Sequence, residues 1–447
     1  MKASAILGLN ARTMMYSYEY NKNKGKVIAA SKLKTKKALK KADIPIPEVY
    51  KIIKKPETIT TFDWQSLPKS FALKPSKGLG GDGIIVIKKR SKDGEAWIGT
   101  DRRRYTVEDL KLHTLDILEG AYSMRNTADV AYMEEYVGRH KAFRKYAYRG
   151  TPDIRVIVFN KVPVMAMLRL PTKDSGGRAN LHQGAIGVGI DIATGITTRS
   201  IWYGDYIKYK PGTKRKLNGI KIPNWTRILK IAVDCSNSVS LGYVGVDVVM
   251  HPTKGPMVLE INYQPGLQIQ LANRAGLRKR LERVEDLKIK SSEHGVNIAK
   301  TLFAEHFSDR VRNEDSVKHI AALEEITIRG KAPGTRRHKV LAKIDTGAWR
   351  TSISYKLAEE LGLLHEDNIL WYKHVRSSLG KDKRPVIGLT FWLAGRKIKT
   401  PASVAKRMAL KYPVIIGRKN LKGFLVDPDI RKNPLRKKAV EEAKQKN

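Results

Sequence analysis

The stretch "GYVGVDVVMHPTKGPMVLEINYQPG" (242–266) could bring two carboxylates together on one β-hairpin. Two apolar runs flank "HPTKGP", whose proline, glycine and polar residues are typical of a turn. If Met250 pairs with Met257 across that turn, then Asp247 lies directly opposite Glu260.

Asn262 completes this group, because the two-residue period of a strand puts it on the same face as Glu260. Two opposed carboxylates repel each other by a few tenths of a kcal/mol or more. A hard cation reverses that sign, and three oxygen ligands suit Mg²⁺ (or Mn²⁺) shared with phosphate groups. The alternative is an exposed strand with incidental acids. The apolar character of both strands predicts burial and favours the metal site.

A glycine-rich loop in "SFALKPSKGLGGDGIIVIKK" (70–89) could bind phosphate. Strands are expected at 71–74 and 83–88, and backbone N–H groups between them can approach an anion closely where no Cβ intervenes. Lys74 stands at the end of the first strand. The loop lacks the Gly-Lys-Ser/Thr ending of a Walker loop, so a glycine-rich hairpin turn is the alternative. Its glycines are Gly78, Gly80, Gly81 and Gly83.

The charge of the chain predicts a polyanionic partner. It has 86 Lys and Arg against 43 Asp and Glu, a formal charge of +43. Nucleic acid, an acidic membrane surface or an acidic polypeptide would each fit, and a solvated basic surface is the alternative.

The one cysteine, Cys235, excludes an intrachain disulfide and fits a reducing compartment. With no signal peptide and no apolar run of about 20 residues, we expect a cytoplasmic protein without a membrane span.

The elements that must position these residues fall into successive segments. A lysine-rich lead-in (1–60) contains "SKLKTKKALKKADIPIPEVY", which predicts a short helix ending at two prolines. A domain of alternating strands and turns is expected over 61–308 and a β-rich domain over 320–430, with the boundary at 308–320. A polar, basic tail (431–447) follows.

Several ordered motifs of the first 300 residues resemble the ATP-grasp ligases, specifically the RimK-type glutamate ligases and their sugar-transfer-associated branch. They include "LGLNARTMMYSYEYN", "KPSKGLGGDGI", "MEEYV", "DIRVIVFNKVPVMAMLRLPT" and "GGRANLHQGAIGVGIDIATG". The resemblance implies an α+β ATP-grasp domain that phosphorylates a carboxylate to an acyl phosphate, which an amine then attacks. Positive groups are needed there because negative charge accumulates on the phosphoryl oxygens.

The resemblance also assigns roles to residues. Arg169 would steady the transferred phosphoryl group, and Asp247, Glu260 and Asn262 would ligate Mg²⁺. The ATP contacts would come from Lys32, Lys74, Gly78, Gly80, Gly81, Glu135, Tyr136, Asp153, Arg178 and Asn180.

The sequence departs from the family pattern in three places. The lead-in is too short for the separate α/β domain with which many ATP-grasp ligases begin. Ser31 stands where an aspartate commonly precedes the lysine. The stretch "VGRHKAFRKYAYRGTP" (137–152) is long and basic, which predicts either an acceptor-binding insertion or a solvated loop.

Residues 320–430 resemble a small, mainly β retropepsin-like domain of the "ATP-dependent zinc protease" family. "KVLAKIDTGAWRTSISYKLAEELGL" predicts strand, active loop, strand and helix, and "VIIG" (414–417) would cradle the loop. Asp345 would be the catalytic carboxylate and Thr346 its orienting hydroxyl. Zinc finds no support, because the sequence has no His-Glu-x-x-His motif and no cysteine cluster.

Aspartic protease chemistry needs two carboxylates that share a proton, and this domain supplies one. A twofold axis would bring Asp345 against its copy, so an active domain predicts a homodimer. The alternative is a non-catalytic binding module.

Together these patterns predict an ATP- and Mg²⁺-dependent ligase that adds an amino acid, glutamate above others, to a peptide or protein. The fused domain would cleave or bind the product. The charge leaves two polyanions open, an acidic tail or RNA. The alternatives are a ribosome- or nucleic-acid-associated modifying enzyme and a non-enzymatic scaffold.

Overall fold

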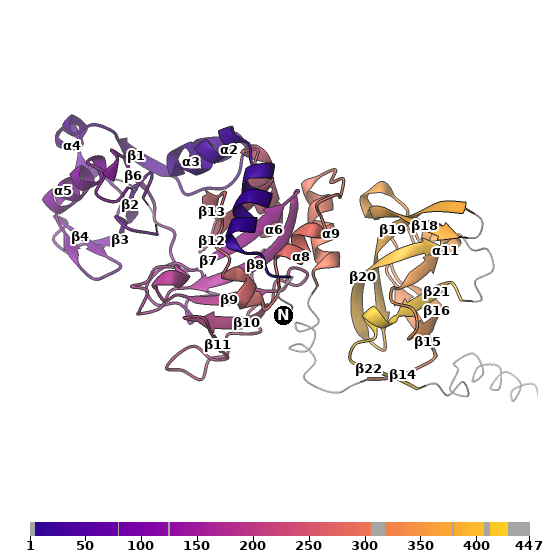
Figure 1. Ribbon diagram of the computed structural model, residues 1–447. Helices are drawn as coiled ribbons and strands as arrows, with labels where there is room; N and C mark the ends of the chain where they lie inside the picture. The colour runs from indigo at the N-terminus through magenta and orange to yellow at the C-terminus, as the bar shows by residue number, and fades with distance from the viewer. Residues whose placement is uncertain are drawn as a thin grey trace, which may run out of the picture. The chain divides into compact units, whose positions relative to one another are not determined.

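The computed structural model describes residues 5–78, 80–123, 126–304, 318–377, 380–405 and 412–427 (Figure 1). The chain divides into two compact units after Asp286. The expected boundary at 308–320 falls largely outside the described residues, as does the expected tail at 431–447. Within the described ranges, no helix combines the length and apolar character that crossing a membrane would require.

The division after Asp286 differs from the domain of 61–308 expected from the sequence. It places helix α9 (Ser292–Leu302) in the second unit. There the His294 ring Nε2 lies 3.1 Å from the Ile369 carbonyl oxygen, and Lys290 forms an ion pair with Glu366.

The first unit contains an antiparallel sheet in the order β1-β6-β2-β3-β4-β5. Helix α4 (Glu57–Thr61) and helix α5 (Val107–Leu118) pack against it through a core that includes the fully buried Trp97 and Phe71 (Figure 1). Helix α5 begins at Thr106, which forms a reciprocal capping box with Asp109. The strands are β1 (Val49–Ile53), β2 (Phe71–Pro75), β3 (Ile85–Arg90), β4 (Trp97–Gly99), β5 (Arg104–Tyr105) and β6 (Ala131–Glu135).

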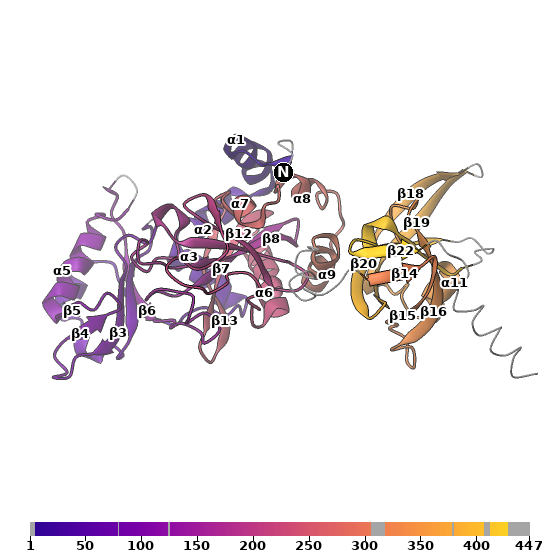
Figure 2. The same ribbon diagram turned by 90° about the horizontal axis from the view of Figure 1, so that it is seen from below.

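A second antiparallel sheet follows the order β11-β10-β9-β8-β7-β12-β13. Every residue of β8 is buried, so both faces of the sheet are covered there (Figure 2). Helix α6 (Trp225–Ser238) and helix α7 (Ile269–Asn273) both pack against that strand. The strands are β7 (Asp153–Phe159), β8 (Val162–Leu170), β9 (Ile186–Ile190), β10 (Thr197–Trp202), β11 (Asp205–Ile207), β12 (Tyr243–His251) and β13 (Gly255–Asn262).

The lead-in is anchored on this second sheet by aromatic packing. The ring of Tyr16 meets Phe159 edge-on at 5.4 Å and lies 5.9 Å from Tyr243. The predicted lysine-rich helix is confirmed as α3 (Lys32–Lys41). Ser31, the departure from the family pattern, caps that helix by accepting a hydrogen bond from the Lys34 N–H.

The β12–β13 hairpin has the predicted carboxylate pair, reached by a different register at its turn. Met250 pairs with Pro256 rather than with Met257, so the predicted methionine pair is wrong. A bulge between Val248 and Asp247 then moves the register by one residue. Asp247 therefore lies opposite Glu260, as predicted.

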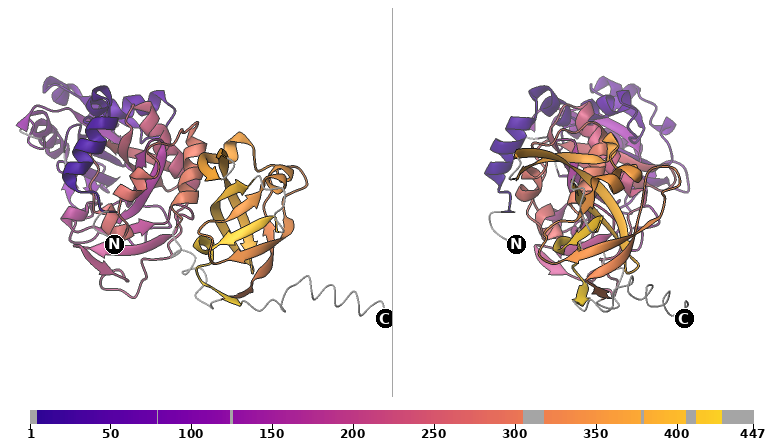
Figure 3. Two further views of the ribbon diagram at one scale, coloured as in Figure 1. Left: turned by 45° about the vertical axis from the view of Figure 1, so that its right-hand side comes forward. Right: turned by 90° about the vertical axis from the view of Figure 1, so that its right-hand side faces the viewer.

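The second unit is a closed β-barrel (Figure 3). Its sheet runs β15-β16-β21-β17-β20-β19-β18, and β15 also pairs with β19. The predicted order of strand, loop, strand and helix is confirmed by β16, β17 and α11. The elements are β15 (Leu323–Ile328), β16 (His338–Asp345), β17 (Ser352–Ser354), α11 (Tyr355–Glu360), β18 (Ile369–Ser377), β19 (Gly380–Leu393), β20 (Arg396–Ala405) and β21 (Val414–Gly417). A parallel pair, β14 (Lys318–Ala321) and β22 (Phe424–Asp427), lies outside this sheet.

Packing of α7 on the second sheet depends on Gly189 in β9. A Cβ at that position would lie 2.4 Å from the backbone oxygen of Ala272. Gly189→Ala is therefore expected to lower the free energy of unfolding by about 1–3 kcal/mol, measured by denaturant titration. Gly8→Ala is the matched control, because a Cβ there meets nothing within 4 Å. Equal stability of the two variants would contradict this account of the packing.

Candidate active site

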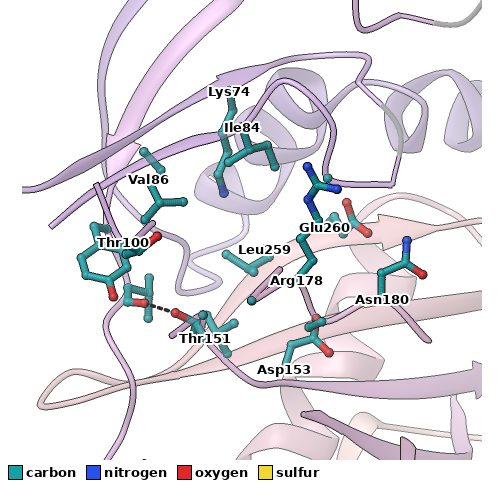
Figure 4. Close-up of a pocket in the computed structure, with 18 of the residues that line it drawn as sticks. Lys74, Ile84, Val86, Thr100, Thr151, Asp153, Arg178, Asn180, Leu259 and Glu260 are labelled. Carbon is teal, nitrogen blue, oxygen red and sulfur yellow. Dashed lines mark hydrogen bonds between the residues drawn. The ribbon is translucent and has the colours of Figure 1, made fainter. Parts of the chain in front are cut away.

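A cavity of about 540 Å³ in the first unit is lined by strands of both sheets (Figure 4). Strands β2, β3 and β6 contribute from the first sheet, and β7, β8, β12 and β13 from the second. Every residue of this unit to which the family resemblance assigned a role lines it. These are Lys32, Lys74, Gly78, Gly80, Gly81, Glu135, Tyr136, Asp153, Arg169, Arg178, Asn180, Asp247, Glu260 and Asn262. The binding roles of these residues stay predictions.

Glu134 fixes Lys74 at one wall of this cavity. The Glu134 carboxylate is 1% exposed and lies between two ammonium groups, 2.5 Å from Lys74 Nζ and 2.6 Å from Lys36 Nζ. Burial alone would raise the pKa of Glu134, but the two lysines outweigh it and lower that pKa below its ordinary value of 4.5. Neither Glu134 nor Lys36 was predicted from the sequence. The doubled glutamate of "MEEYV" was the available signal, because neighbouring strand residues face opposite ways.

Lys32 lies beside the glycine-rich loop. Its ammonium group donates a hydrogen bond to the Gly78 carbonyl at 2.5 Å. Burial lowers the pKa of Lys32, Lys74 adds to that effect, and the nearby Glu260 carboxylate opposes it. An anion bound between Lys32 and Lys74 would relieve their mutual repulsion.

The "GRAN" segment reaches the other side of the same loop. The Asn180 amide donates to the Gly80 carbonyl at 3.4 Å, and Arg178 lies 3.4 Å from Asp82. Gly80 has a φ of +64°, a left-handed conformation that favours glycine. Backbone and cations from two distant segments thus surround one small space.

A buried network of four charges crosses the second sheet. The strand register creates it, because Asp153 pairs with Arg169 and Arg155 pairs with Asp247 across neighbouring strands. Arg155 binds Asp247 through two hydrogen bonds of 2.7 and 2.6 Å, and Arg169 binds Asp153 through two of 2.5 and 2.6 Å. Arg169 also donates to Asp247 Oδ2 at 2.7 Å. Arg155 was missed from the sequence, although its spacing from Asp153 puts both on one strand face.

The two aspartates of this network differ in their affinity for a proton. Burial raises the pKa of Asp153 to about 6, and the nearby charge of Asp247 adds to that effect. Burial also disfavours ionised Asp247, but Arg155 and Arg169 outweigh it and hold its pKa well below the usual range. Asp247 is therefore the carboxylate that stays ionised.

The oxygen ligands suggested for a metal ion do converge. The Asn262 amide lies 3.4 Å from Asp247 Oδ2 and 3.2 Å from Glu260 Oε1. Rotation of that amide would present its oxygen in place of its N–H groups, which gives an all-oxygen set suited to Mg²⁺. Among the described residues, no group of three His, Cys, Asp or Glu side chains is placed so that it could hold a metal ion.

Part of the cavity wall is apolar. Val86 and Leu259 lie on it (Figure 4). Next to it, the Glu135 carboxylate is held 2.5 Å from Lys254 Nζ, and Tyr136 is half-buried. A flat, uncharged ring would fit against this surface.

The Asp-Thr-Gly segment of the second unit lies at the end of β16. Asp345 Oδ1 accepts hydrogen bonds from the backbone N–H groups of Gly347 at 2.9 Å and Ala348 at 3.0 Å. Strand β21 runs parallel to β16 and pairs Asp345 with Gly417, so the expected neighbour of the loop is confirmed. Thr346 is exposed, and its orienting role stays a prediction.

A buried threonine further along supports this loop. Thr351 Oγ1 donates to Asn420 Oδ1 at 2.8 Å and accepts from the Gly417 N–H at 3.3 Å. Nothing in the local sequence identified Thr351, because its partners are more than sixty residues away.

Comparison with known families identifies the class of the first unit. The family model for sugar-transfer associated ATP-grasp proteins matches residues 11–286. That match spans more than half of the chain, so the chain belongs to this family and the first unit has the ATP-grasp fold. A search of the curated proteins found no matching relative.

The comparison with solved structures also found similarities to parts of this chain. The ATP-grasp ligase PsnB bound to a minimal precursor is 14% identical, with 60% of this chain and 63% of that chain covered and a TM-score of 0.33. Biotin carboxylase from Campylobacter jejuni is 13% identical, with 60% and 49% covered and a TM-score of 0.39. The simian foamy virus protease is 18% identical, with 22% and 90% covered and a TM-score of 0.17. The chain spans less than two thirds of the two ATP-grasp proteins.

The buried Lys36–Glu134–Lys74 group generates a stability prediction. Glu134→Gln leaves two ammonium groups against a neutral amide and is expected to lower the free energy of unfolding by about 3–5 kcal/mol. Because the pKa of Glu134 is lowered in the folded state, its contribution is present above pH 4.5 and is lost as the pH falls below it. Denaturant titrations at pH 7 and in acid measure both effects.

The control for this prediction is Glu108→Gln. Glu108 forms an exposed pair with Lys111, and its side chain is 79% exposed. An exposed pair contributes about 0–1 kcal/mol. A loss in Glu134→Gln no greater than in this control would contradict the stabilising role of Glu134.

Proposed function

We propose that the first unit is an ATP-dependent carboxylate–amine ligase of the RimK type. It adds an amino acid, in the first instance glutamate, to an amine of a peptide or protein. The observation that carries this proposal is the convergence of two lysines, a glycine-rich loop and an oxygen triad on one cavity. Family membership supports ATP as the nucleotide that binds here. The residue types in the cavity support the ligase reaction.

ATP lies along the cavity in this proposal. Lys32 and Lys74 bind its phosphates together with backbone N–H groups of the glycine-rich loop. The adenine ring lies against the apolar surface of Val86 and Leu259, beside Tyr136. Glu134 keeps Lys74 directed at the phosphates.

Asp247, Glu260 and Asn262 hold Mg²⁺ in this proposal, because the Asn262 amide lies against both carboxylates and carboxylates bind hard cations. When bound, Mg²⁺ neutralises charge on the transferring phosphoryl group. Arg155 and Arg169 keep Asp247 ionised and correctly oriented for this purpose.

The reaction has two steps. A carboxylate oxygen of one substrate attacks the γ-phosphorus of ATP, the bond to the β-phosphate oxygen breaks, and ADP leaves. The amine of the second substrate then attacks the acyl phosphate, inorganic phosphate leaves, and the excess proton passes to solvent. Arg155 and Arg169 stabilise the negative charge that develops in both steps, because their hydrogen bonds to Asp247 and Asp153 already hold both guanidinium groups at the cavity.

The Glu260 carboxylate gives the ligase proposal its sharpest test. With ATP, Mg²⁺ and single amino acids plus a peptide acceptor, the wild-type protein is expected to release ADP and form a product of the added mass. Glu260→Gln is expected to lower ADP release by at least about a hundred-fold, because a carboxylate is lost from the metal site. Glu108→Gln should leave the rate unchanged. Unchanged turnover in Glu260→Gln would refute the proposed metal site. The absence of ADP release by the wild type would refute the proposed ligase activity.

We further propose that the second unit is a retropepsin-like domain that cleaves the product of the first. Its support is the Asp345 carboxylate, oriented by two backbone N–H groups at the end of a barrel strand. The second carboxylate comes from a second copy of the chain, since two such groups must share one proton.

An enzyme that consumes ATP and has one buried cysteine, Cys235, fits a cytoplasmic location.

The peptidase proposal predicts that Asp345→Asn abolishes cleavage. Wild-type protein is expected to shorten a polyglutamate product, followed by mass spectrometry, and to sediment as a dimer under the same conditions. Asp367→Asn, at a side chain that is 82% exposed, is the control and should retain cleavage. If the wild type never shortens the product, the domain is a binding module instead. Cleavage by a monomer would refute the proposal that a second copy of the chain supplies the second carboxylate.

A further inference from the structure

A cluster of basic side chains adjoins the cavity and takes no part in the chemistry described above. It consists of residues 139–149 and 208–216, which we call the basic rim. Each range contains five Lys or Arg residues and neither contains an acidic residue. Most of these cations are exposed.

The two ranges are held together by their own side chains. Arg215 Nη1 donates to the Lys145 carbonyl at 2.7 Å, and Lys210 Nζ lies 3.4 Å from the same oxygen. Burial, together with Arg215 and Arg139, lowers the pKa of Lys210, which reflects the crowding of like charges. Within the described part of the chain, no cation of the basic rim forms an ion pair with a carboxylate. An anion bound here would turn this repulsion into attraction.

The basic rim continues into the wall of the cavity. Arg149, Gly150 and Thr151 all line the cavity. Arg149 Nη1 donates to the Asp101 carbonyl at 3.3 Å, and Thr151 Oγ1 donates to the Val137 carbonyl at 2.5 Å. These contacts hold both ends of the insertion at the cavity, so a chain bound on the rim is close to the reacting groups.

The tyrosines of the basic rim favour a carboxylate ligand over a nucleic acid. Arg215 lies over the Tyr146 ring at 5.7 Å and Arg149 over the Tyr148 ring at 5.0 Å. Lys208 likewise lies 5.6 Å from the centre of the Tyr209 ring. Binding of single-stranded nucleic acid relies on bases stacking on aromatic faces, and one face of each ring is already covered. Most of the cations of the basic rim are exposed, so carboxylates can still reach them.

We propose that the basic rim binds an acidic polypeptide, a run of glutamate or aspartate side chains, and directs its end into the cavity. This proposal rests on the ligase function, for which it names the substrate class. It gives the basic insertion a role in acceptor binding and assigns part of the positive charge of the chain to its substrate.

Binding by the full-length chain without ATP tests the basic rim. Fluorescence anisotropy follows a labelled peptide of about ten glutamates, with a glutamine peptide and a single-stranded RNA of equal length as comparisons. The rim variant carries Lys141→Gln, Arg144→Gln and Lys214→Gln, three exposed positions. The matched control loses the same charge at three exposed positions away from the rim, by Lys40→Gln, Lys54→Gln and Lys55→Gln.

The rim variant is expected to bind the glutamate peptide about ten-fold more weakly than the wild type, and the control less than about two-fold more weakly. The KM for that peptide in ADP release should rise in parallel. Equal affinities of the two variants, or tighter binding of the RNA with displacement of the peptide, would overturn the proposal. Peptide binding without turnover by the wild type would instead refute only the ligase. If the enzyme turns over an acceptor that binds both variants equally, only the proposed role of the basic rim in acceptor binding would be refuted.

Discussion

The charge balance around Asp247 is the constraint on which the first unit depends. Three carboxylates, those of Asp153, Asp247 and Glu260, lie close together at buried or half-buried positions. Ionised groups there are costly unless they are paired and hydrogen-bonded. Arg155 and Arg169 pair with two of these carboxylates, Asp153 and Asp247, across the neighbouring strands β8, β7 and β12. The register of these three strands is therefore favoured by charge pairing as well as by side-chain packing.

The opposite wall of the cavity uses the same principle with the signs exchanged. There the carboxylate of Glu134 compensates two ammonium groups, and the excess positive charge of Lys32 and Lys74 faces the cavity. One wall thus offers cations and the other offers carboxylates with guanidinium groups behind them. A nucleotide with a divalent cation complements both walls at once, which is why the proposed function places the triphosphate between them.

The features predicted correctly from the sequence are those that depend on residues close together in the chain. The strand period put Glu260 and Asn262 on one face, and two prolines indicated where helix α3 ends. The predictions failed where a strand register shifts by one residue. The predicted Met250–Met257 pair was wrong, and the carboxylates met only because a bulge compensated for the different register at the turn. Lys36 and Thr351 were missed because their partners, Glu134 and Asn420, are distant in sequence.

By itself, the sequence determined which side-chain types could bind a metal ion or phosphate, and the order of the motifs. It also determined the strong positive charge and the single Asp-Thr-Gly segment. These follow from residue identity and short spacing. Only the tertiary structure decided that Arg155 and Arg169 share Asp247, that Glu134 fixes Lys74, and that residues 139–149 meet residues 208–216 beside the cavity. The physical reason is that such contacts depend on sheet order and register. Packing over the whole unit sets these, and no local periodicity encodes them.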